Sequence, residues 1–266
     1  MSKCDLELID NSGGDAGNAN RHNRFEVMSK TAKSIEFFAF QVDRSFFASR
    51  GRRRIPSERM SAKRDARSRA WSLKQAKDPY VAAARAQGFR SRAAFKLEQL
   101  DKKDRLFRKG MNVIDLGAAP GSWSQYAVSK VSSTGRVIAL DRLKMASIPG
   151  VSFIHGDFLE STVIEEIRSI CGEEQFDLVI SDMAPNLTGI RDVDQAAMGE
   201  LVAKAAVFAQ GLLHEKGVFV AKFFEGVEAK HLISDLTKRF KSCRVRKPEA
   251  SRAESAEVYV IARNPI

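Results

Sequence analysis

The sequence predicts an α/β protein built on a mostly parallel sheet with helices on both of its faces. From about residue 91 onward, short apolar segments of strand length alternate with segments of helical periodicity, which is typical of parallel sheets. A glycine-rich turn follows the first of these strands, and an aspartate stands at or near the ends of four strands. Open α/β sheets bind ligands at that carboxyl edge, so the pattern also predicts where the site lies.

The elements follow one another with short connections. Ser91 is expected to cap a helix in which Ala94, Phe95, Leu97 and Leu100 recur at helical spacing. Strands are predicted at 112–116, 136–140, 151–155, 176–180, 218–222 and 258–262, and helices at 122–130, 162–170, 193–213 and 232–240.

Charge and composition restrict the function. The chain has 266 residues, 44 lysines and arginines against 33 acidic residues, and a formal charge of +11, which favours a polyanionic partner. Its three cysteines, Cys4, Cys171 and Cys243, form no CxxC pair, and its four histidines show no ligand spacing, so no disulfide framework and no metal site are expected. No apolar run reaches the ~18–20 residues that a membrane span needs, so we expect a soluble, cytoplasmic protein.

The N-terminal third differs from the rest. Residues 1–59 include a polar, glycine-rich stretch and are expected to be either a disordered extension or an upstream stretch that is not translated, with Met60 as the true start; the second hypothesis is favoured. Residues 60–90 are strongly basic, with Trp71, Tyr80 and Phe89 interleaved. This composition favours an RNA-binding arm over a solvated helix face with core aromatics. Residues 91–266 form the predicted catalytic domain.

The most informative stretch runs from Val113 to Trp123. Gly117 and Gly121 stand four residues apart with Pro120 between them, unlike the GxGxxG of a dinucleotide site, and glycine allows backbone to approach a ligand closely. Asp115 supplies a carboxylate that suits a cationic ligand such as S-adenosylmethionine. A plain strand–turn–helix with structural glycines is the alternative interpretation.

Further acids follow the next strands. Asp141 lies about 20 residues beyond the glycine-rich turn, where it would bind ribose hydroxyls. Asp157 is expected to accept a hydrogen bond from an adenine amino group, and Asp182 follows the fourth strand. Any one aspartate would be explained as a helix cap, but four at one sheet edge indicate a ligand site.

Five short segments occur in a characteristic order and spacing. They are SRAAFKL at 91–97, DLGAAPGSW at 115–123, SDMAPN at 181–186, VAKFF at 220–224 and EVY at 257–259. Together they resemble those of the FtsJ-type heat-shock ribosomal RNA methyltransferases, over roughly Met60 to the C-terminus. Ser122 stands where that family usually has a second glycine.

The resemblance implies a Rossmann-like methyltransferase fold with a seven-stranded sheet, and S-adenosylmethionine as the cofactor. It implies a catalytic tetrad of Lys96, Asp182, Lys222 and Glu257. Lys222 is the candidate base for the ribose 2′-hydroxyl, Lys96 is a neighbouring charge that would lower its pKa, and the two acids orient the ammonium groups. The cofactor-binding residues expected are Asp115, Gly117, Gly121, Trp123, Asp141, Asp157 and Asp182.

The substrate implied is a uridine ribose in large-subunit ribosomal RNA, within the large ribosomal particle, methylated by a monomeric enzyme. Two related alternatives stay open: methylation of transfer RNA or of messenger RNA caps, which use the same tetrad, and RNA binding without catalysis in ribosome assembly. A nicotinamide dehydrogenase is disfavoured because the chain lacks GxGxxG.

Overall fold

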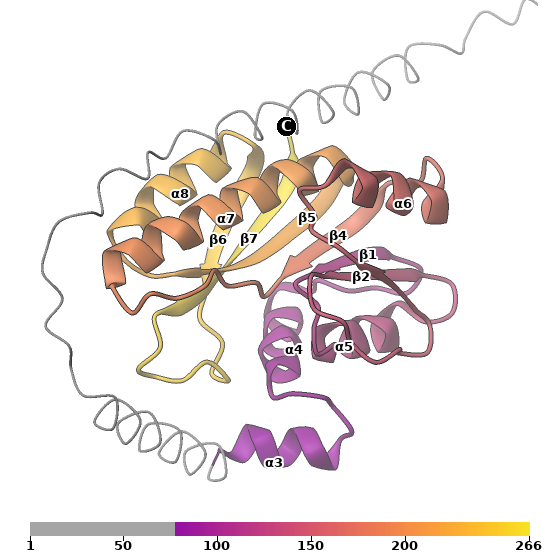
Figure 1. The fold of residues 1–266 in the computed structure, drawn as a ribbon, viewed down its shortest axis with the longest axis horizontal. Coiled ribbons are helices and arrows are strands. Elements are labelled where there is room, and N and C mark those ends of the chain that lie inside the picture. Colours follow the sequence, from indigo (N-terminus) through magenta and orange to yellow (C-terminus); the bar gives the residue numbers. More distant parts are fainter. Residues whose placement is uncertain (1–77) are drawn as a thin grey trace, which may run out of the picture. The chain divides into compact units, whose positions relative to one another are not determined.

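The computed structural model describes residues 78–266, which form one seven-stranded sheet with helices on both of its faces (Figure 1). The strands are β1 Asn112–Leu116, β2 Arg136–Asp141, β3 Val151–His155, β4 Phe176–Ser181, β5 Leu213–Phe224, β6 Phe240–Arg246 and β7 Glu257–Pro265. The helices are α3 Pro79–Ala86, α4 Ala93–Asp104, α5 Ser122–Val131, α6 Ser161–Cys171, α7 Arg191–Leu212 and α8 Val227–Thr237.

The strand order is β3-β2-β1-β4-β5-β7-β6, and the first five strands in this order run parallel. Strand β7 is antiparallel to both of its neighbours, β5 and β6. Helices α5, α6 and α7 lie in three of the four connections between the parallel strands, whereas residues 142–150, between β2 and β3, contain no helix. Strands β6 and β7 are joined as a hairpin. The prediction of a mostly parallel sheet with helices on both faces is confirmed.

The two faces of the sheet are covered by different helices. On one face, Leu97 and Leu100 of α4 and Trp123 of α5 pack in a buried cluster with strand residues such as Val220. Figure 1 shows α6, α7 and α8 on the opposite side of the sheet. There Phe208 of α7 packs edge to face on Phe158. Burial on both faces explains why the central strands are continuous apolar segments.

The end of the domain departs from the sequence-based prediction. A helix was expected at 232–240, but α8 runs over Val227–Thr237, and Phe240 opens strand β6, which was not predicted. The β6 strand lies at the sheet edge, and most of its side chains are exposed, so it lacks an apolar pattern. Its one buried residue, Phe240, stacks on Phe219 with ring centroids 6.0 Å apart.

Smaller differences lie before β1. Ser91 does not cap α4; Arg92 occupies the N-cap position, while Ser91 Oγ accepts from Ala93 N at 3.2 Å. Within the expected basic arm, residues 79–86 form α3, where Asp78 caps the helix by accepting from Tyr80 N at 3.0 Å. The predictions for residues 1–59, and for the arm before residue 78, lie outside the described residues.

The described residues show two further features. No helix in residues 78–266 is long and apolar enough to cross a membrane. Within the same residues, no group of three or more His, Cys, Asp or Glu side chains is placed to hold a metal ion.

Candidate active site

Strand register brings three of the four expected catalytic residues together. Ser181 pairs with Ala221 across the parallel β4–β5 ladder, so the next residues along the two strands, Asp182 and Lys222, lie side by side. Lys222 in turn pairs with Tyr259 of the antiparallel β7. Residues two apart on a strand share a face, so Glu257 joins Tyr259 on the side that Lys222 also occupies.

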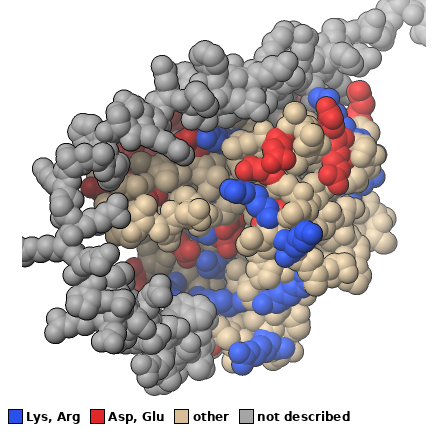
Figure 2. Space-filling view, viewed as in Figure 1, with Lys and Arg blue, Asp and Glu red and all other residues tan. Residues whose placement is uncertain are grey.

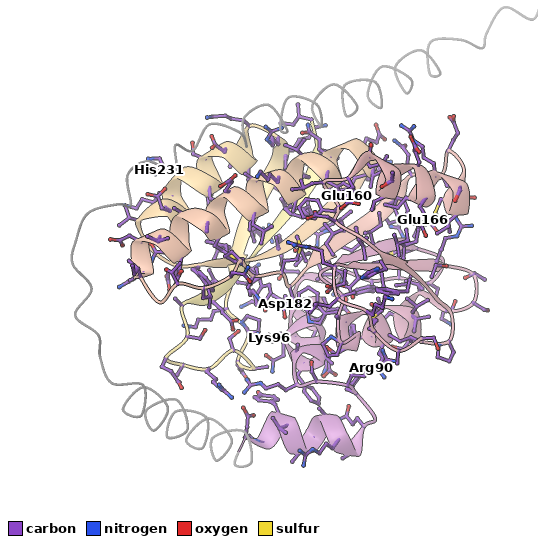
Figure 3. The ribbon with its side chains drawn as sticks, viewed as in Figure 1. Arg90, Lys96, Glu160, Glu166, Asp182 and His231 are labelled. Carbon is purple, nitrogen blue, oxygen red and sulfur yellow. The ribbon has the colours of Figure 1, made fainter. Side chains whose placement is uncertain are left out.

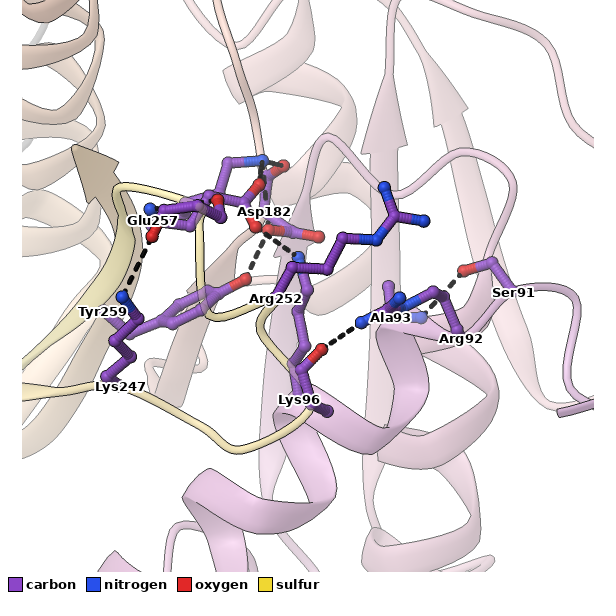
Figure 4. Close-up of polar contacts among 12 residues, drawn as sticks. Ser91, Arg92, Ala93, Lys96, Asp182, Lys247, Arg252, Glu257 and Tyr259 are labelled. Atoms are coloured by element: carbon purple, nitrogen blue, oxygen red, sulfur yellow. Dashed lines mark hydrogen bonds and ion pairs between the residues drawn. The ribbon is translucent and has the colours of Figure 1, made fainter. Parts of the chain in front are cut away.

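The fourth residue, Lys96, comes from the first turns of α4, which covers this face of the sheet. Its Nζ lies 3.0 Å from Glu257 Oε2, while Lys222 Nζ lies 4.0 Å from the other oxygen, Oε1. Glu257 therefore lies between the two lysines. Lys222 Nζ also lies 3.1 Å from Asp182 Oδ1 and donates to the Asp182 backbone oxygen at 2.7 Å. Figure 4 shows Lys96, Asp182 and Glu257 gathered in one site.

Both lysines are largely removed from solvent, with Lys222 only 6% and Lys96 only 9% exposed. Burying a charge is costly unless an opposite charge and hydrogen bonds accompany it. Two carboxylates supply that compensation here, one for each ammonium group. The residues that the sequence predicted as a tetrad therefore form one connected, charge-balanced group.

Tyr259 is a member of this site to which the sequence analysis assigned no role. Its hydroxyl donates to Asp182 Oδ1 at 2.8 Å, and Lys96 Nζ lies 5.9 Å from its ring centroid. Burial first, and then the nearby carboxylates, raise the pKa of Tyr259 well above its ordinary value, so the phenol stays a donor. A buried aromatic on a core strand is usually a packing residue, so the sequence pattern alone gave no signal for this role.

Asp115 is fully buried within β1, beneath the glycine-rich turn. Its Oδ2 accepts from Ser124 Oγ at 2.6 Å, whereas Oδ1 has no hydrogen-bond partner among the described residues. Burial raises the pKa of Asp115 to about 7; the Ser124 bond opposes the rise, and the charges of Asp182 and Asp141 add to it. A buried acid with one free oxygen marks a position where a cationic group would be stabilised.

The two glycines of the turn make room for side chains of the protein itself. Both have positive φ, +74° at Gly117 and +106° at Gly121. A Cβ at Gly117 would lie 2.3 Å from Met183 Cγ, and one at Gly121 would lie 2.6 Å from Ile148 Cδ1. The backbone conformation and the packing at both positions require glycine. These residues therefore have a structural role in addition to the close approach to a ligand that the sequence predicted.

The other two acids of this sheet edge, Asp141 and Asp157, accept hydrogen bonds from backbone amides. Asp141 accepts from Ala119 N at 2.8 Å through Oδ2 and from Leu143 N at 2.7 Å through Oδ1, so it ties the glycine-rich turn to the segment after β2. Asp157 accepts from Leu159 N at 3.1 Å. Each carboxylate oxygen has a second lone pair, so these bonds leave acceptor capacity for a ligand.

The side chain of Trp123, which was expected to bind the cofactor, is buried in the core. Its side chain is 2% exposed, and its indole nitrogen donates to Ala93 O at 2.8 Å. Its ring centroid lies 5.7 Å from that of Tyr259. The indole therefore belongs to the core beneath the site and links α5, α4 and β7.

Comparison with known proteins decides the family. The model of the FtsJ-like methyltransferase family matches residues 89–265. The chain belongs to the FtsJ-like methyltransferase family. The chain is 46% identical to "Ribosomal RNA large subunit methyltransferase E" of Xanthomonas campestris over 207 residues, which cover 78% of this chain and 96% of the relative. It is 48% identical over 203 residues to the protein of that name from Halorhodospira halophila, covering 76% and 96%.

Among solved structures, a putative ribosomal RNA methyltransferase from Plasmodium falciparum matches with a TM-score of 0.62 and 27% identity. The match covers 66% of this chain and 98% of the other. It agrees with the Rossmann-like methyltransferase fold expected from the sequence.

FtsJ-like methyltransferases use S-adenosylmethionine, and the residues at this sheet edge fit that cofactor. The fit rests on the unpartnered Oδ1 of buried Asp115, on the glycine-rich turn beside it, on Asp141 at the end of β2 and on Asp157, two residues after β3. Bound there, the cofactor supplies a methyl group activated by a positively charged sulfur. Together with its relatives, the family shows that this enzyme is an RNA methyltransferase.

A pocket of about 470 Å³ opens beside the tetrad of this FtsJ-like methyltransferase. Arg92 is paired with Asp78, and Arg252 Nη2 lies 3.6 Å from the same carboxylate, so the β6–β7 connection is held against the start of α4. The pocket is lined by Ser91, Arg92, Ala93, Lys96, Arg252, Glu254, Ser255 and Glu257.

Charge is distributed unevenly over the surface around the sheet. Figure 2 shows lysine and arginine side chains over the part of the domain where α3, α4 and α5 lie in Figure 1. Acidic side chains gather at the α6 end of the same view. Glu160 and Glu166 lie at that end in Figure 3, whereas Lys96 and Asp182 lie together near the middle. A polyanion would be attracted to the α3–α5 side.

Proposed function

We propose that this enzyme methylates the 2′-hydroxyl of a uridine ribose in large-subunit ribosomal RNA, within the large ribosomal particle. The observation that carries the proposal is the connected tetrad, in which Glu257 lies between Lys96 and Lys222 while Asp182 pairs with Lys222. The relatives named as large-subunit methyltransferases match the chain over nearly their whole length, which supports this substrate over other RNAs.

The tetrad is suited to proton removal and to holding a ribose. In this mechanism Lys222 would take the proton of the ribose 2′-hydroxyl, and the bound cofactor would supply the methyl group to that oxygen and keep the electrons of its methyl–sulfur bond. A lysine accepts a proton only when it is neutral, so this step requires the free amine of Lys222. Asp182 and Glu257 hold the two amines in place. Alignment of the hydroxyl with the methyl group supplies part of the rate.

For the cofactor-binding residues we propose the roles expected from the sequence. Asp115 would stabilise the cationic part of the cofactor, Asp141 the ribose hydroxyls and Asp157 the adenine amino group. Gly117 and Gly121 shape the turn around it. Trp123 would act through its backbone, because its side chain is buried in the core.

The RNA would approach from the α3–α5 side and enter the pocket beside Lys96 and Glu257. In this proposal residues 60–90 are an RNA-binding arm, and residues 91–266 are the catalytic domain. We further propose that the enzyme acts as a monomer in the cytoplasm, where its ribosomal substrate is found.

The decisive test offers several RNAs to the same enzyme with radiolabelled S-adenosylmethionine. Large ribosomal subunits from a strain that lacks this gene should be methylated at one uridine ribose, and free large-subunit RNA, transfer RNA and capped messenger RNA should be poorer acceptors. Mapping of 2′-O-methyl groups identifies the nucleotide. Preferred methylation of transfer RNA or caps would replace this substrate, and binding without any transfer would favour a non-catalytic assembly role.

A further inference from the structure

Arg90, which lies between α3 and α4, joins its own segment to two others on the cofactor side of the domain. Its Nη1 donates to Pro120 O at 2.9 Å and to Ala146 O at 2.7 Å, and its Nη2 donates to Ser147 O at 2.7 Å. Pro120 belongs to the glycine-rich turn, and Ala146 and Ser147 belong to the segment between β2 and β3. Figure 3 shows Arg90 on the α5 side of the sheet.

The backbone at Arg90 is itself anchored. Its amide donates to Gln125 Oε1 at 2.9 Å, and Gln125 Nε2 donates to Gly88 O at 3.1 Å. One glutamine of α5 thus fixes the stretch that links α3 to α4. The guanidinium therefore extends from a fixed point, which allows it to hold other segments in place.

The packing at Gly121 depends on the same contact. A Cβ there would lie 2.9 Å from Arg90 Nη1, 2.6 Å from Ile148 Cδ1 and 3.2 Å from Met145 Sδ. Gly121 therefore leaves the space into which Arg90 and the β2–β3 segment fit. Ile148 is the one buried residue of positions 142–150, which contain neither helix nor strand. The segment thus has few packing contacts of its own, and Arg90 supplies two of its attachments.

We infer that Arg90 is a positioning residue for S-adenosylmethionine binding, which holds the glycine-rich turn and the β2–β3 segment in their binding arrangement. The inference rests on the cofactor assignment made above. It also changes the expected role of Arg90, which lies at the end of the basic arm and would otherwise be counted as a phosphate contact. Both Nη1 hydrogens and one Nη2 hydrogen are already donated within the protein.

The test compares Arg90→Met and Arg90→Lys with the wild-type enzyme and with Arg85→Met. Arg85 is an exposed arginine at the end of α3, so its variant controls for loss of one positive charge. Calorimetry without RNA should show S-adenosylmethionine binding weakened by about tenfold or more in Arg90→Met, equivalent to losing one hydrogen bond to a charged group. Arg90→Lys should weaken it less, because one ammonium cannot span all three carbonyl groups.

Two further measurements separate positioning from general damage. The KM for S-adenosylmethionine should rise while kcat at saturating cofactor stays within about twofold, because the tetrad is untouched. Amide hydrogen exchange without cofactor should quicken at residues 142–150 and around Pro120, and stay unchanged in the central strands. The exchange result does not depend on the cofactor or on the RNA substrate, so it distinguishes failure of this inference from failure of the proposed function.

Cofactor affinity equal to wild type in Arg90→Met, or unchanged exchange in the two segments, would overturn the inference. Loss of RNA affinity with intact cofactor binding would do the same, and would make Arg90 an RNA contact.

Discussion

The hydroxyl of Tyr259 donates a 2.8 Å hydrogen bond to Oδ1 of Asp182, the same oxygen that lies 3.1 Å from Lys222 Nζ. The Asp182 side chain is thus held from one side by a neutral donor and from the other by a cation. Because Tyr259 is fully buried, this geometry is fixed by the core packing of β7 and not by a surface contact. The phenol therefore determines where the carboxylate, and with it the candidate base, can lie.

Tyr259→Phe should lower kcat by about tenfold and leave cofactor affinity near wild type, because it loosens Asp182 without touching the glycine-rich turn. Loss of a buried hydrogen bond should also reduce the free energy of unfolding by roughly 1–2 kcal/mol. Tyr126→Phe is the matched control. The Tyr126 hydroxyl also donates a 2.8 Å hydrogen bond to a carboxylate, that of Asp101, which is not part of the tetrad. Equal losses of kcat in the two variants would exclude a specific role for Tyr259.

Lys222→Ala should abolish methyl transfer, with single-turnover rates at least about 100-fold lower, because the variant lacks the proposed base. Calorimetric affinity for S-adenosylmethionine should stay near wild type, since the lysine acts on the ribose. Lys216→Ala removes an exposed lysine from the same strand, β5, and should leave both quantities unchanged. A single-turnover rate near wild type in Lys222→Ala would rule out the base.

The free energy of unfolding of Asp115→Asn should rise relative to that of the wild type as the pH rises from about 4 to about 7. The folded chain holds the proton of Asp115 up to about pH 7, whereas the unfolded chain releases it near its ordinary value of 3.8. Wild-type stability therefore falls with rising pH in that window, by at most about 1.4 kcal/mol per pH unit from this one group. The difference between the two proteins should level off above pH 7.

Urea unfolding of both proteins at several pH values between 4 and 8 measures that difference. Other titrating groups are common to both chains and cancel. Parallel stability profiles for wild type and Asp115→Asn would contradict the raised pKa.

Asp157→Ala should weaken S-adenosylmethionine binding by roughly 1–3 kcal/mol, if the adenine amino group then lies buried without an acceptor. The substitution also removes the bond to Leu159 N, so thermal unfolding must be followed alongside calorimetry. Asp194→Ala is a suitable control, since Asp194 accepts in the same way from Thr188 N and Gly189 N, in the connection between β4 and α7. Unchanged affinity in Asp157→Ala would remove this residue from the adenine site.

Neutralising Lys63, Arg64, Arg67 and Arg69 together should flatten the dependence of log RNA affinity on log salt. Each phosphate that the variant no longer neutralises should lower the slope by about 0.7–0.9. Arg90 and Arg92 should contribute little, because both donate to groups of the protein itself. A salt slope that the fourfold variant leaves unchanged would move the RNA-binding surface elsewhere.

The alternation of strands and helices was predictable from the sequence because local physics determines it. The run 112–116 is buried along nearly its whole length, and 151–155, at the sheet edge, is partly buried. The structure has both strands at the predicted bounds. The edge strand β6 was not predicted, since its exposed and charged residues carry no apolar signal. The start of α8 was placed five residues late for a related reason, because the exposed Val227 and its polar neighbours give a weak periodicity.

The sequence by itself predicted the tetrad of Lys96, Asp182, Lys222 and Glu257, because these residue types at this spacing resemble a known family. It assigned no role to Tyr259, and it did not determine how the residues contact one another. Tertiary structure decided that Glu257 lies between two lysines, that Tyr259 holds Asp182, and that the side chain of Trp123 points into the core. These contacts depend on the register between β4, β5 and β7 and on the docking of α4. Lys96 and Glu257 are 161 positions apart in the sequence and meet only when the sheet has assembled and α4 has packed on it. No local sequence pattern encodes a contact between residues so far apart.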